Sequence, residues 1–240
     1  MSRWWRGLYL LGVMLALPAL ADERPLRVTI NDVEPYTIHQ ADGSRGGMHM
    51  DILNALIRTS GISMESTSVV YVRIAAALKD GSADLVVGVE GPELDALADR
   101  VLPFHTFRSV VIPRAGLGID RIESLRGRHL GMARGAFYDE RINNDDSIIK
   151  DAIADPFQGV RMLSFGRLDA VISSDYLLHY ALRQSGLDRK QFDPIFTINE
   201  RRYAMYARKG LDPVLIRQLQ HAMALLQRKG ELERILARYQ

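Results

Sequence analysis

The chain of 240 residues contains no cysteine. This absence excludes disulfide bonds, thiolate metal sites and a cysteine nucleophile, although it does not identify a cellular compartment. Tryptophan is nearly absent as well, because Trp4 and Trp5 are the only two in the sequence and both lie in the first few residues.

Hydrophobic runs long enough to span a membrane are also missing. The most apolar stretch, residues 7–17, is uncharged but much shorter than the roughly 20 residues that a spanning helix needs. Arg3 and Arg6 precede it, and Ala19-Leu20-Ala21 has the small-x-small pattern of a cleavage site. We therefore expect residues 1–21 to be a signal peptide cleaved after Ala21, which predicts a periplasmic protein without stable membrane insertion after cleavage.

Neither sign of charge is in excess once that segment is set aside. It carries two of the 31 basic residues and none of the 29 acidic ones, so the remaining chain is formally balanced. An overall pI of about 8.9 would otherwise suggest nucleic acid as a partner, but the charges are interspersed and form no basic field. We expect no nucleic-acid partner and a monomer of one large domain or two of about 100 residues.

A short pattern occurs twice in the sequence. The stretches "DGSADLVVG" (residues 80–88) and "FGRLDAVIS" (residues 165–173) share Gly-x-x-Asp followed by small and β-branched apolar residues. The glycine is suited to ending a helix, and the apolar run without alternation is typical of a strand covered on both faces. The pattern predicts two α/β units, each with its own sheet, in which Asp84 and Asp169 are structural turn residues.

The segments before the first copy alternate between strand and helix signals. A strand is predicted over residues 26–30, then a helix in which Leu53, Leu56 and Ile57 share one face and Gly61 ends the helix. We interpret residues 63–68 as a polar break and residues 69–72 as the next strand, followed by a short helix.

The second copy has the same surroundings. Residues 128–133 predict a strand, a long irregular stretch follows, and Asp155 and Pro156 are suited to beginning a helix. The stretch "FRSVVIPRAGLGID" (residues 107–120) is the candidate crossing between the two units. Asp212 and Pro213 begin the next predicted helix, and a last short helix follows Gly230.

Six segments in this order resemble the periplasmic solute-binding proteins of the amino-acid-binding type, bacterial family 3. They are "LRVTINDVEPY", "GGMHMDILNAL", "AALKDGSADLVVG", "SLRGRHLGMARGAFY", "FGRLDAVISSD" and "YAMYARKGLDPVLIRQLQHAMALLQRKGELERILARY". The resemblance implies a two-lobed α/β fold of the periplasmic-binding-protein type II class, with two crossings between lobes. Lobe one would comprise residues 22–111 with 203–240, and lobe two residues 113–199.

The function that this resemblance implies is binding of a small polar solute, an amino acid or related amine, in the cleft between the lobes. Delivery to the permease of an ABC importer would follow. Carried over position by position, the family's ligand contacts fall on the strand ends and the loops after them. We add Glu90, the acidic residue that follows the predicted strand at residues 85–89. The candidate ligand-binding residues are then Asp32, Tyr36, Tyr71, Gly88, Glu90, Arg134, Phe137, Ser174 and Asp175.

The sequence departs from the family pattern where an arginine normally binds the ligand's α-carboxylate, because residues 94–98 contain none. Losing a bidentate charged contact should weaken binding at least about tenfold. Either Arg100 or Arg134 substitutes, or the ligand is not an ordinary α-amino acid. Glu90 and Glu93 would suit a cationic ligand such as a polyamine or a guanidino compound.

Each candidate also has a structural interpretation. Tyr71 can pack inside lobe one, Asp175 can cap the helix that follows it, and Arg134 can be a solvated loop charge. Glu90 can lie on the rim without touching a ligand.

Motifs for catalysis or metal binding are scarce. The six histidines are scattered, and neither HExxH nor G-x-S-x-G occurs. We predict no metal and no cofactor, and interpret His49 as structural. Two alternatives stay open: an enzyme that resembles periplasmic cyclohexadienyl dehydratase, with Glu90 or Asp175 as acid or base, and a ligand-binding partner of a sensor.

Overall fold

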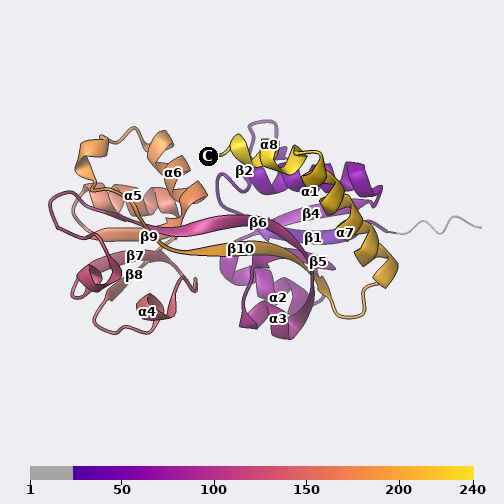
Figure 1. Ribbon diagram of the computed structural model, residues 1–240, viewed down its shortest axis with the longest axis horizontal. Helices are drawn as coiled ribbons and strands as arrows, with labels where there is room; N and C mark the ends of the chain where they lie inside the picture. Colours follow the sequence, from indigo (N-terminus) through magenta and orange to yellow (C-terminus); the bar gives the residue numbers. More distant parts are fainter. Residues whose placement is uncertain (1–23) are drawn as a thin grey trace, which may run out of the picture.

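A computed structural model describes residues 24–240 (Figure 1). The predicted signal peptide, residues 1–21, lies outside the described residues. The described chain forms a mixed α/β fold built on an eight-stranded sheet, whose strand order is β4-β1-β5-β10-β6-β9-β7-β8. Its strands are β1 (Leu26–Asn31), β4 (Met64–Val69), β5 (Leu85–Val89), β6 (Ala98–Pro113), β7 (His129–Ala133), β8 (Ile149–Ile153), β9 (Ala170–Ser174) and β10 (Phe196–Arg208).

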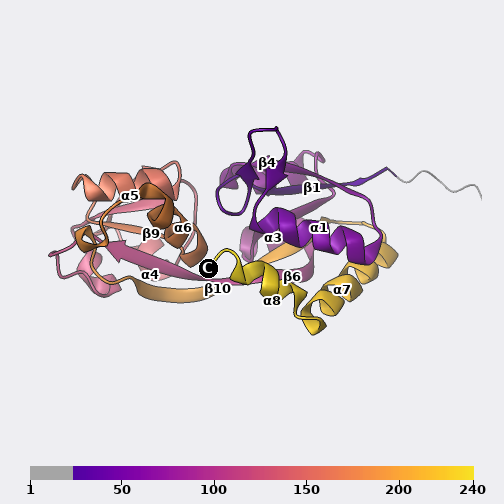
Figure 2. The same cartoon turned by 90° about the horizontal axis from the view of Figure 1, so that it is seen from above.

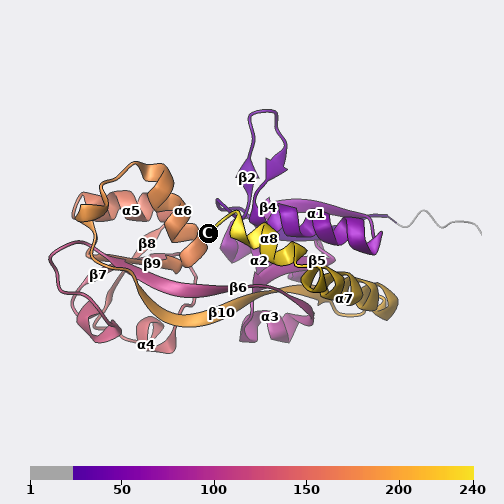
Figure 3. The same ribbon diagram turned by 45° about the horizontal axis from the view of Figure 1, so that its top comes forward.

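Helices cover both faces of this sheet. They are α1 (Met48–Ser60), α2 (Ile74–Lys79), α3 (Pro92–Leu97), α4 (Glu140–Asn143), α5 (Pro156–Ser164), α6 (Asp175–Ser185), α7 (Pro213–Arg228) and α8 (Glu231–Ala237). Three short 3-10 helices accompany them: η1 (Tyr71–Arg73), η2 (Ile122–Leu125) and η3 (Arg189–Gln191). A separate hairpin of β2 (Ile38–His39) and β3 (Arg45–Gly46) projects from the body (Figure 3).

The elements gather into two lobes, as the resemblance implies (Figures 1 and 2). The first lobe holds the parallel strands β4-β1-β5 with α1, α2, α3, α7 and α8, and the second holds the parallel strands β9-β7-β8 with α4, α5 and α6. Strands β6 and β10 run through both lobes as one antiparallel pair. The α/β two-lobed fold with two crossings is therefore confirmed.

The prediction of two separate sheets is wrong. The strands β6 and β10 are 16 and 13 residues long, and their pairing extends from Ala98 opposite Arg208 to Val111 opposite Phe196. At one end β10 also pairs with β5, and at the other β6 also pairs with β9. Because β10 borders one parallel group, β6 borders the other, and the two strands pair with each other, hydrogen bonding is continuous across one sheet.

The crossing in β6 lies inside the strand. Phe107 packs in a core of the first lobe, whereas Val110 packs in a core of the second, and β6 begins to pair with β9 at Ser109. The chain therefore passes between the lobes as extended, hydrogen-bonded backbone.

Each lobe has an apolar core on both faces of its part of the sheet. Residues of α1, α7 and α8 fill one face of the first lobe, and α2 and α3 fill the other. In the second lobe α5 and α6 fill one face, and η2 and α4 the other. All residues of β5 and β9 are buried, as predicted from the apolar run that follows each copy of the Gly-x-x-Asp pattern.

Two strands differ from the sequence-based prediction. The stretch interpreted as a polar break is strand β4, and the second half of the predicted strand at residues 69–72 belongs to the 3-10 helix η1. β4 is an edge strand with little buried surface, so polar residues are compatible with it. Strand β8, also at a sheet edge, lies inside the stretch that was interpreted as irregular.

Candidate functional site

A pocket lies where the two lobes face each other. Residues from both lobes line it: Asn31, Asp32, Val33, Val70, Tyr71, Val89 and Phe107 from the first, and Ala133, Ala136, Phe137, Tyr138, Ile153, Ala154, Asp155, Pro156, Ile172, Ser173, Ser174 and Leu177 from the second, with Arg201 and Tyr203 of β10. Most of these side chains are apolar.

The sheet topology explains why these residues meet. Asn31, Val89, Ala133, Ile153 and Ser174 are each the last residue of a parallel strand. Open α/β sheets bind ligands beyond the carboxyl ends of their strands. Here the carboxyl ends of both parallel groups open onto the same pocket.

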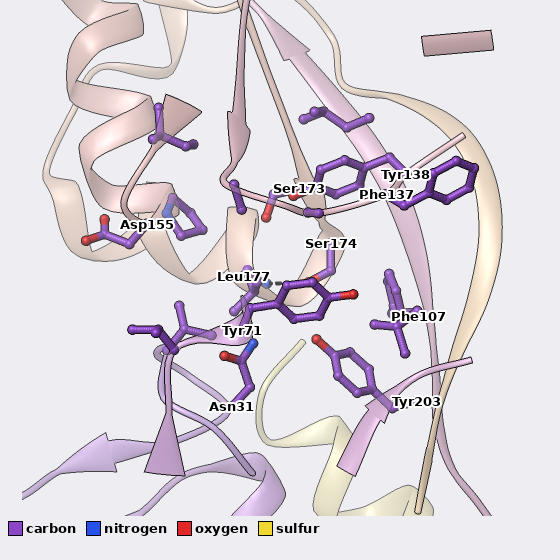
Figure 4. A pocket seen from close by; sticks show the side chains of 18 of the residues that line it. Asn31, Tyr71, Phe107, Phe137, Tyr138, Asp155, Ser173, Ser174, Leu177 and Tyr203 are labelled. Atoms are coloured by element: carbon purple, nitrogen blue, oxygen red, sulfur yellow. Dashed lines mark hydrogen bonds between the residues drawn. The ribbon is translucent and has the colours of Figure 1, made fainter. Parts of the chain in front are cut away.

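Tyr71 begins η1 and projects into the middle of the group, between Ser174 and Tyr203 (Figure 4). Burial raises the pKa of its phenol, while the nearby Arg201 acts in the opposite direction. Burial also raises the pKa of Tyr138 to about 12. Both phenols therefore stay protonated and can donate hydrogen bonds at neutral pH.

Ser174 lines the pocket, and its hydroxyl makes two hydrogen bonds with neighbouring residues. Its hydroxyl oxygen lies 2.8 Å from the hydroxyl of Tyr36 and also accepts a hydrogen bond from the backbone N–H of Leu177, which caps α6. Ser174, and not Asp175, is therefore the residue that caps this helix. Because Tyr36 belongs to the first lobe and Ser174 to the second, their hydroxyl pair joins the lobes.

Tyr36 also belongs to a buried group of aromatic rings that includes His49 and His105. Tyr36 is stacked on His49 with ring centroids 4.2 Å apart, and Nε2 of His49 lies 2.9 Å from Nε2 of His105. Burial lowers the pKa of His105 to about 4 and holds that of His49 well below its ordinary value. Both imidazoles are therefore neutral at pH 7, which agrees with the structural interpretation of His49.

Four of the predicted site residues line the pocket: Asp32, Tyr71, Phe137 and Ser174. The carboxylate of Asp32 also bonds outward, with Oδ1 2.6 Å from Nε2 of His39. Phe137 is partly exposed at the pocket edge. The structure thus brings together two residues of predicted loops, Asp32 and Phe137, with Tyr71 of a predicted strand and Ser174 at a predicted strand end.

The other five predicted residues do not line this pocket: Tyr36, Gly88, Glu90, Arg134 and Asp175. Tyr36 is completely buried. Gly88 faces α3 instead, and a Cβ added there would lie 2.3 Å from Cδ1 of Leu94. Arg134 is exposed in the loop after β7, which agrees with its interpretation as a solvated loop charge.

The two acidic residues of that group are held by arginines. Glu90 pairs with Arg202 at 3.2 Å and with Arg100 at 3.5 Å. Asp175 pairs with Arg108 at 3.0 Å. Their carboxylates are thus engaged in salt bridges outside the pocket lining.

Several lining residues were not predicted from the sequence, chiefly Asn31, Phe107, Leu177, Arg201 and Tyr203. Asn31 and Leu177 are neighbours of the predicted Asp32 and Asp175, so a wider window around each strand end would have included them. Phe107, Arg201 and Tyr203 come from the crossing strands β6 and β10, and no local sequence signal marks them.

Within residues 24–240, no group of three or more histidine, aspartate or glutamate side chains is arranged to hold a metal ion. Over the same residues, no helix combines the length and apolarity needed to cross a membrane.

Comparison with known proteins agrees with the architecture. A protein from Neisseria gonorrhoeae named "Probable histidine-binding protein" is 23% identical over 232 residues, which covers 93% of this chain and 86% of that protein. Among solved structures, a histidine kinase sensor domain with similarity to periplasmic binding proteins superposes with a TM-score of 0.78 at 22% identity, covering 90% of this chain and 96% of that one.

A second solved structure is the arginine-, lysine-, histidine-binding protein ArtJ from Geobacillus stearothermophilus. It superposes with a TM-score of 0.73 at 17% identity, covering 90% of this chain and 95% of that one. At these identities the structural likeness establishes the fold alone. Residues 26–240 match the sequence family of bacterial extracellular solute-binding proteins, family 3, and the chain belongs to that family.

Proposed function

We propose that this protein binds an amino acid or a related small solute in the pocket between its lobes. The observation that carries the proposal is the pocket lining: Tyr71 and Phe107 of the first lobe face Ser173, Ser174 and Leu177 of the second (Figure 4). A solute held there touches both lobes at once. Membership of a solute-binding family and the amino-acid-binding relatives support the same function.

The proposal includes binding without chemical conversion. The two carboxylates considered as acid or base, Glu90 and Asp175, are paired with arginines and do not line the pocket. Incubation with prephenate or arogenate tests this point, because a binding protein leaves both compounds unchanged, whereas disappearance of either compound contradicts it.

The cellular role that we propose is periplasmic solute uptake by a monomer that has lost residues 1–21. The loaded protein would deliver its solute to the permease of an ABC importer. Reconstituted importer activity that depends on this protein would support delivery, and N-terminal sequencing of the secreted protein would show whether cleavage follows Ala21.

A thermal-shift screen of amino acids, polyamines and organic acids tests the binding function. A ligand at 100 times its dissociation constant should stabilise the folded state by about 2.7 kcal/mol. Phe137→Ala should reduce the shift, because Phe137 lines the pocket. Phe165→Ala is the matched control, since Phe165 is 76% exposed and lies outside the lining, and it should leave the shift unchanged.

A further inference from the structure

Arg201 differs from the other cations near the pocket because it lines the pocket itself. Its guanidinium donates hydrogen bonds to two backbone carbonyl oxygens, those of Phe137 in the second lobe and Glu90 in the first. It also lies 5.7 Å from the centroid of the Phe137 ring. None of these partners carries a negative charge that would neutralise the guanidinium.

The neighbouring arginines are neutralised. Arg100 binds Asp95 at 2.7 Å, Arg108 binds Asp175 at 3.0 Å, and Arg202 binds Glu90 at 3.2 Å. Within residues 24–240, Arg201 has no carboxylate within 4 Å. Its guanidinium has five N–H donors, so donors remain after the two carbonyl contacts.

Both carboxylates of the pocket lining accept hydrogen bonds from groups of the protein. The carboxylates of the lining residues are those of Asp32, bonded to His39, and Asp155, which accepts from the N–H of Gln158 at 2.7 Å and caps α5. Asp155 also lies at the margin of the group in Figure 4. Glu93, which the sequence analysis considered as a partner for a cationic ligand, lies outside this lining. Its side chain is 72% exposed.

The remaining walls are suited to an apolar body. Val89, Phe107 and Leu177 line the pocket together with Ile153 and Ile172. Pockets of this kind bind ligands by burying apolar surface and fix their orientation with a few polar groups. A single uncompensated guanidinium in an apolar setting favours one anionic group on an apolar ligand.

We infer that the solute is a small carboxylate with an apolar or aromatic body, and that Arg201 binds its carboxylate. This inference rests on the proposed function and specifies the ligand of the same pocket. Arg201 would supply, from the crossing strand β10, the carboxylate contact that residues 94–98 lack. A cationic ligand recognised by Glu90 and Glu93 is not compatible with this arrangement.

Two compounds of the same shape test the inference. Calorimetry should show binding of 3-phenylpropanoate at least about tenfold tighter than binding of 3-phenylpropanamide, because the amide lacks the charge that Arg201 recognises. Phenylalanine belongs to the expected class, whereas phenethylamine and spermidine, which lack a carboxylate, should bind weakly or not at all.

The variant Arg201→Met should abolish the preference for the carboxylate over the amide. Comparing the two compounds on the same variant separates a lost charge from a disturbed pocket, because a disturbed pocket weakens both. Arg201→Lys should retain part of the preference. Arg202→Met is the matched control, since Arg202 is the next residue along β10, is exposed and lies outside the lining, and it should keep the full preference.

An equal preference in the wild type and Arg201→Met would overturn the inference, and so would tight binding of spermidine or phenethylamine. In either case the proposed binding function would still stand. If no compound in the full screen binds, the proposed function itself fails, and the inference fails with it.

Discussion

Asp84 and Asp169 occupy the same position in the two lobes. The N–H of Asp84 donates to the carbonyl of Arg27, and its Oδ2 accepts from the N–H of Arg27 at 3.0 Å. Asp169 makes the same pair of contacts with His129, at 2.8 and 3.0 Å. The repeated Gly-x-x-Asp pattern thus fastens the start of one parallel strand to its neighbour in each lobe, which confirms the structural interpretation of both aspartates.

The two aspartates differ in burial and charge. Asp84 has a completely buried side chain and pairs with Arg24, Arg27 and Arg208. The hydrogen bond from Arg24 is the largest cause that lowers the pKa of the Asp84 carboxyl far below its usual range. Asp169 has one such partner, Arg114, at 3.3 Å.

We therefore expect Asp84→Asn to lower the free energy of unfolding by about 3 kcal/mol, because three arginines lose a buried partner. Asp169→Asn should cost about 1 kcal/mol. Urea unfolding of the two variants beside the wild type measures the difference. Equal losses would show that the charges around Asp84 contribute nothing beyond the shared backbone contacts.

The hydroxyl contact between Tyr36 and Ser174 predicts a link between stability and lobe arrangement. Tyr36→Phe keeps the stacking on His49 but removes a buried hydrogen bond between the lobes. We expect a loss of about 1 kcal/mol and a larger radius of gyration in small-angle scattering.

Tyr206→Phe is the control for that variant. It removes a hydrogen bond to Asp95 within the first lobe, so it should lower stability without changing the radius of gyration. Should Tyr36→Phe and Tyr206→Phe scatter alike, the hydroxyl contact would have no role in holding the lobes together.

The buried histidine pair predicts a loss of stability in acid. Nδ1 of His105 lies 3.3 Å from the carbonyl of Thr106, which assigns its proton to Nδ1 and makes Nε2 the acceptor from His49. Nδ1 of His49 is buried without a partner, so an added proton there would have no acceptor. Burial lowers the pKa of His105 from 6.5 to about 4 in the folded state.

The unfolded chain therefore takes up a proton below pH 6.5 that the folded protein takes up only near pH 4. Stability is fully present above pH 6.5 and falls as the pH drops toward 4, by about 1.4 kcal/mol per pH unit for one such group. The double variant with His49→Gln and His105→Gln should flatten this dependence in urea unfolding between pH 7 and 5. His221→Gln is the control, because His221 is exposed, and it should leave the pH dependence unchanged. If the double variant loses stability as steeply as the wild type, the assignment of this dependence to the buried histidine pair is refuted.

Local signals in the sequence were sufficient for most elements, and four of the nine predicted site residues line the pocket. The glycine that ends a helix adopts positive φ in both copies of the pattern, 72° at Gly81 and 70° at Gly166. Asp155 and Asp212 cap helices as predicted. Tyr71 and Ser174 were identified through the resemblance to the solute-binding family, by carrying its ligand contacts over position by position.

The remaining features depend on contacts between distant residues. The single sheet follows from the pairing of β6 with β10, which are far apart in the chain and carry no pairing signal. Arg201 and Arg202 are adjacent in the sequence, yet only Arg201 lines the pocket. Strand residues alternate between faces, and the face that meets the pocket is set by the neighbouring strands.

The central claim is that a solute binds between the lobes, and a fluorescent reporter at the pocket edge tests it most directly. Residues 22–240 contain no tryptophan, so Phe137→Trp introduces a single reporter in that segment, and Phe165→Trp introduces one away from the pocket. Titration with solutes should give a saturable emission change for Phe137→Trp and none for Phe165→Trp. Binding detected by calorimetry without any change in the emission of Phe137→Trp would contradict the account.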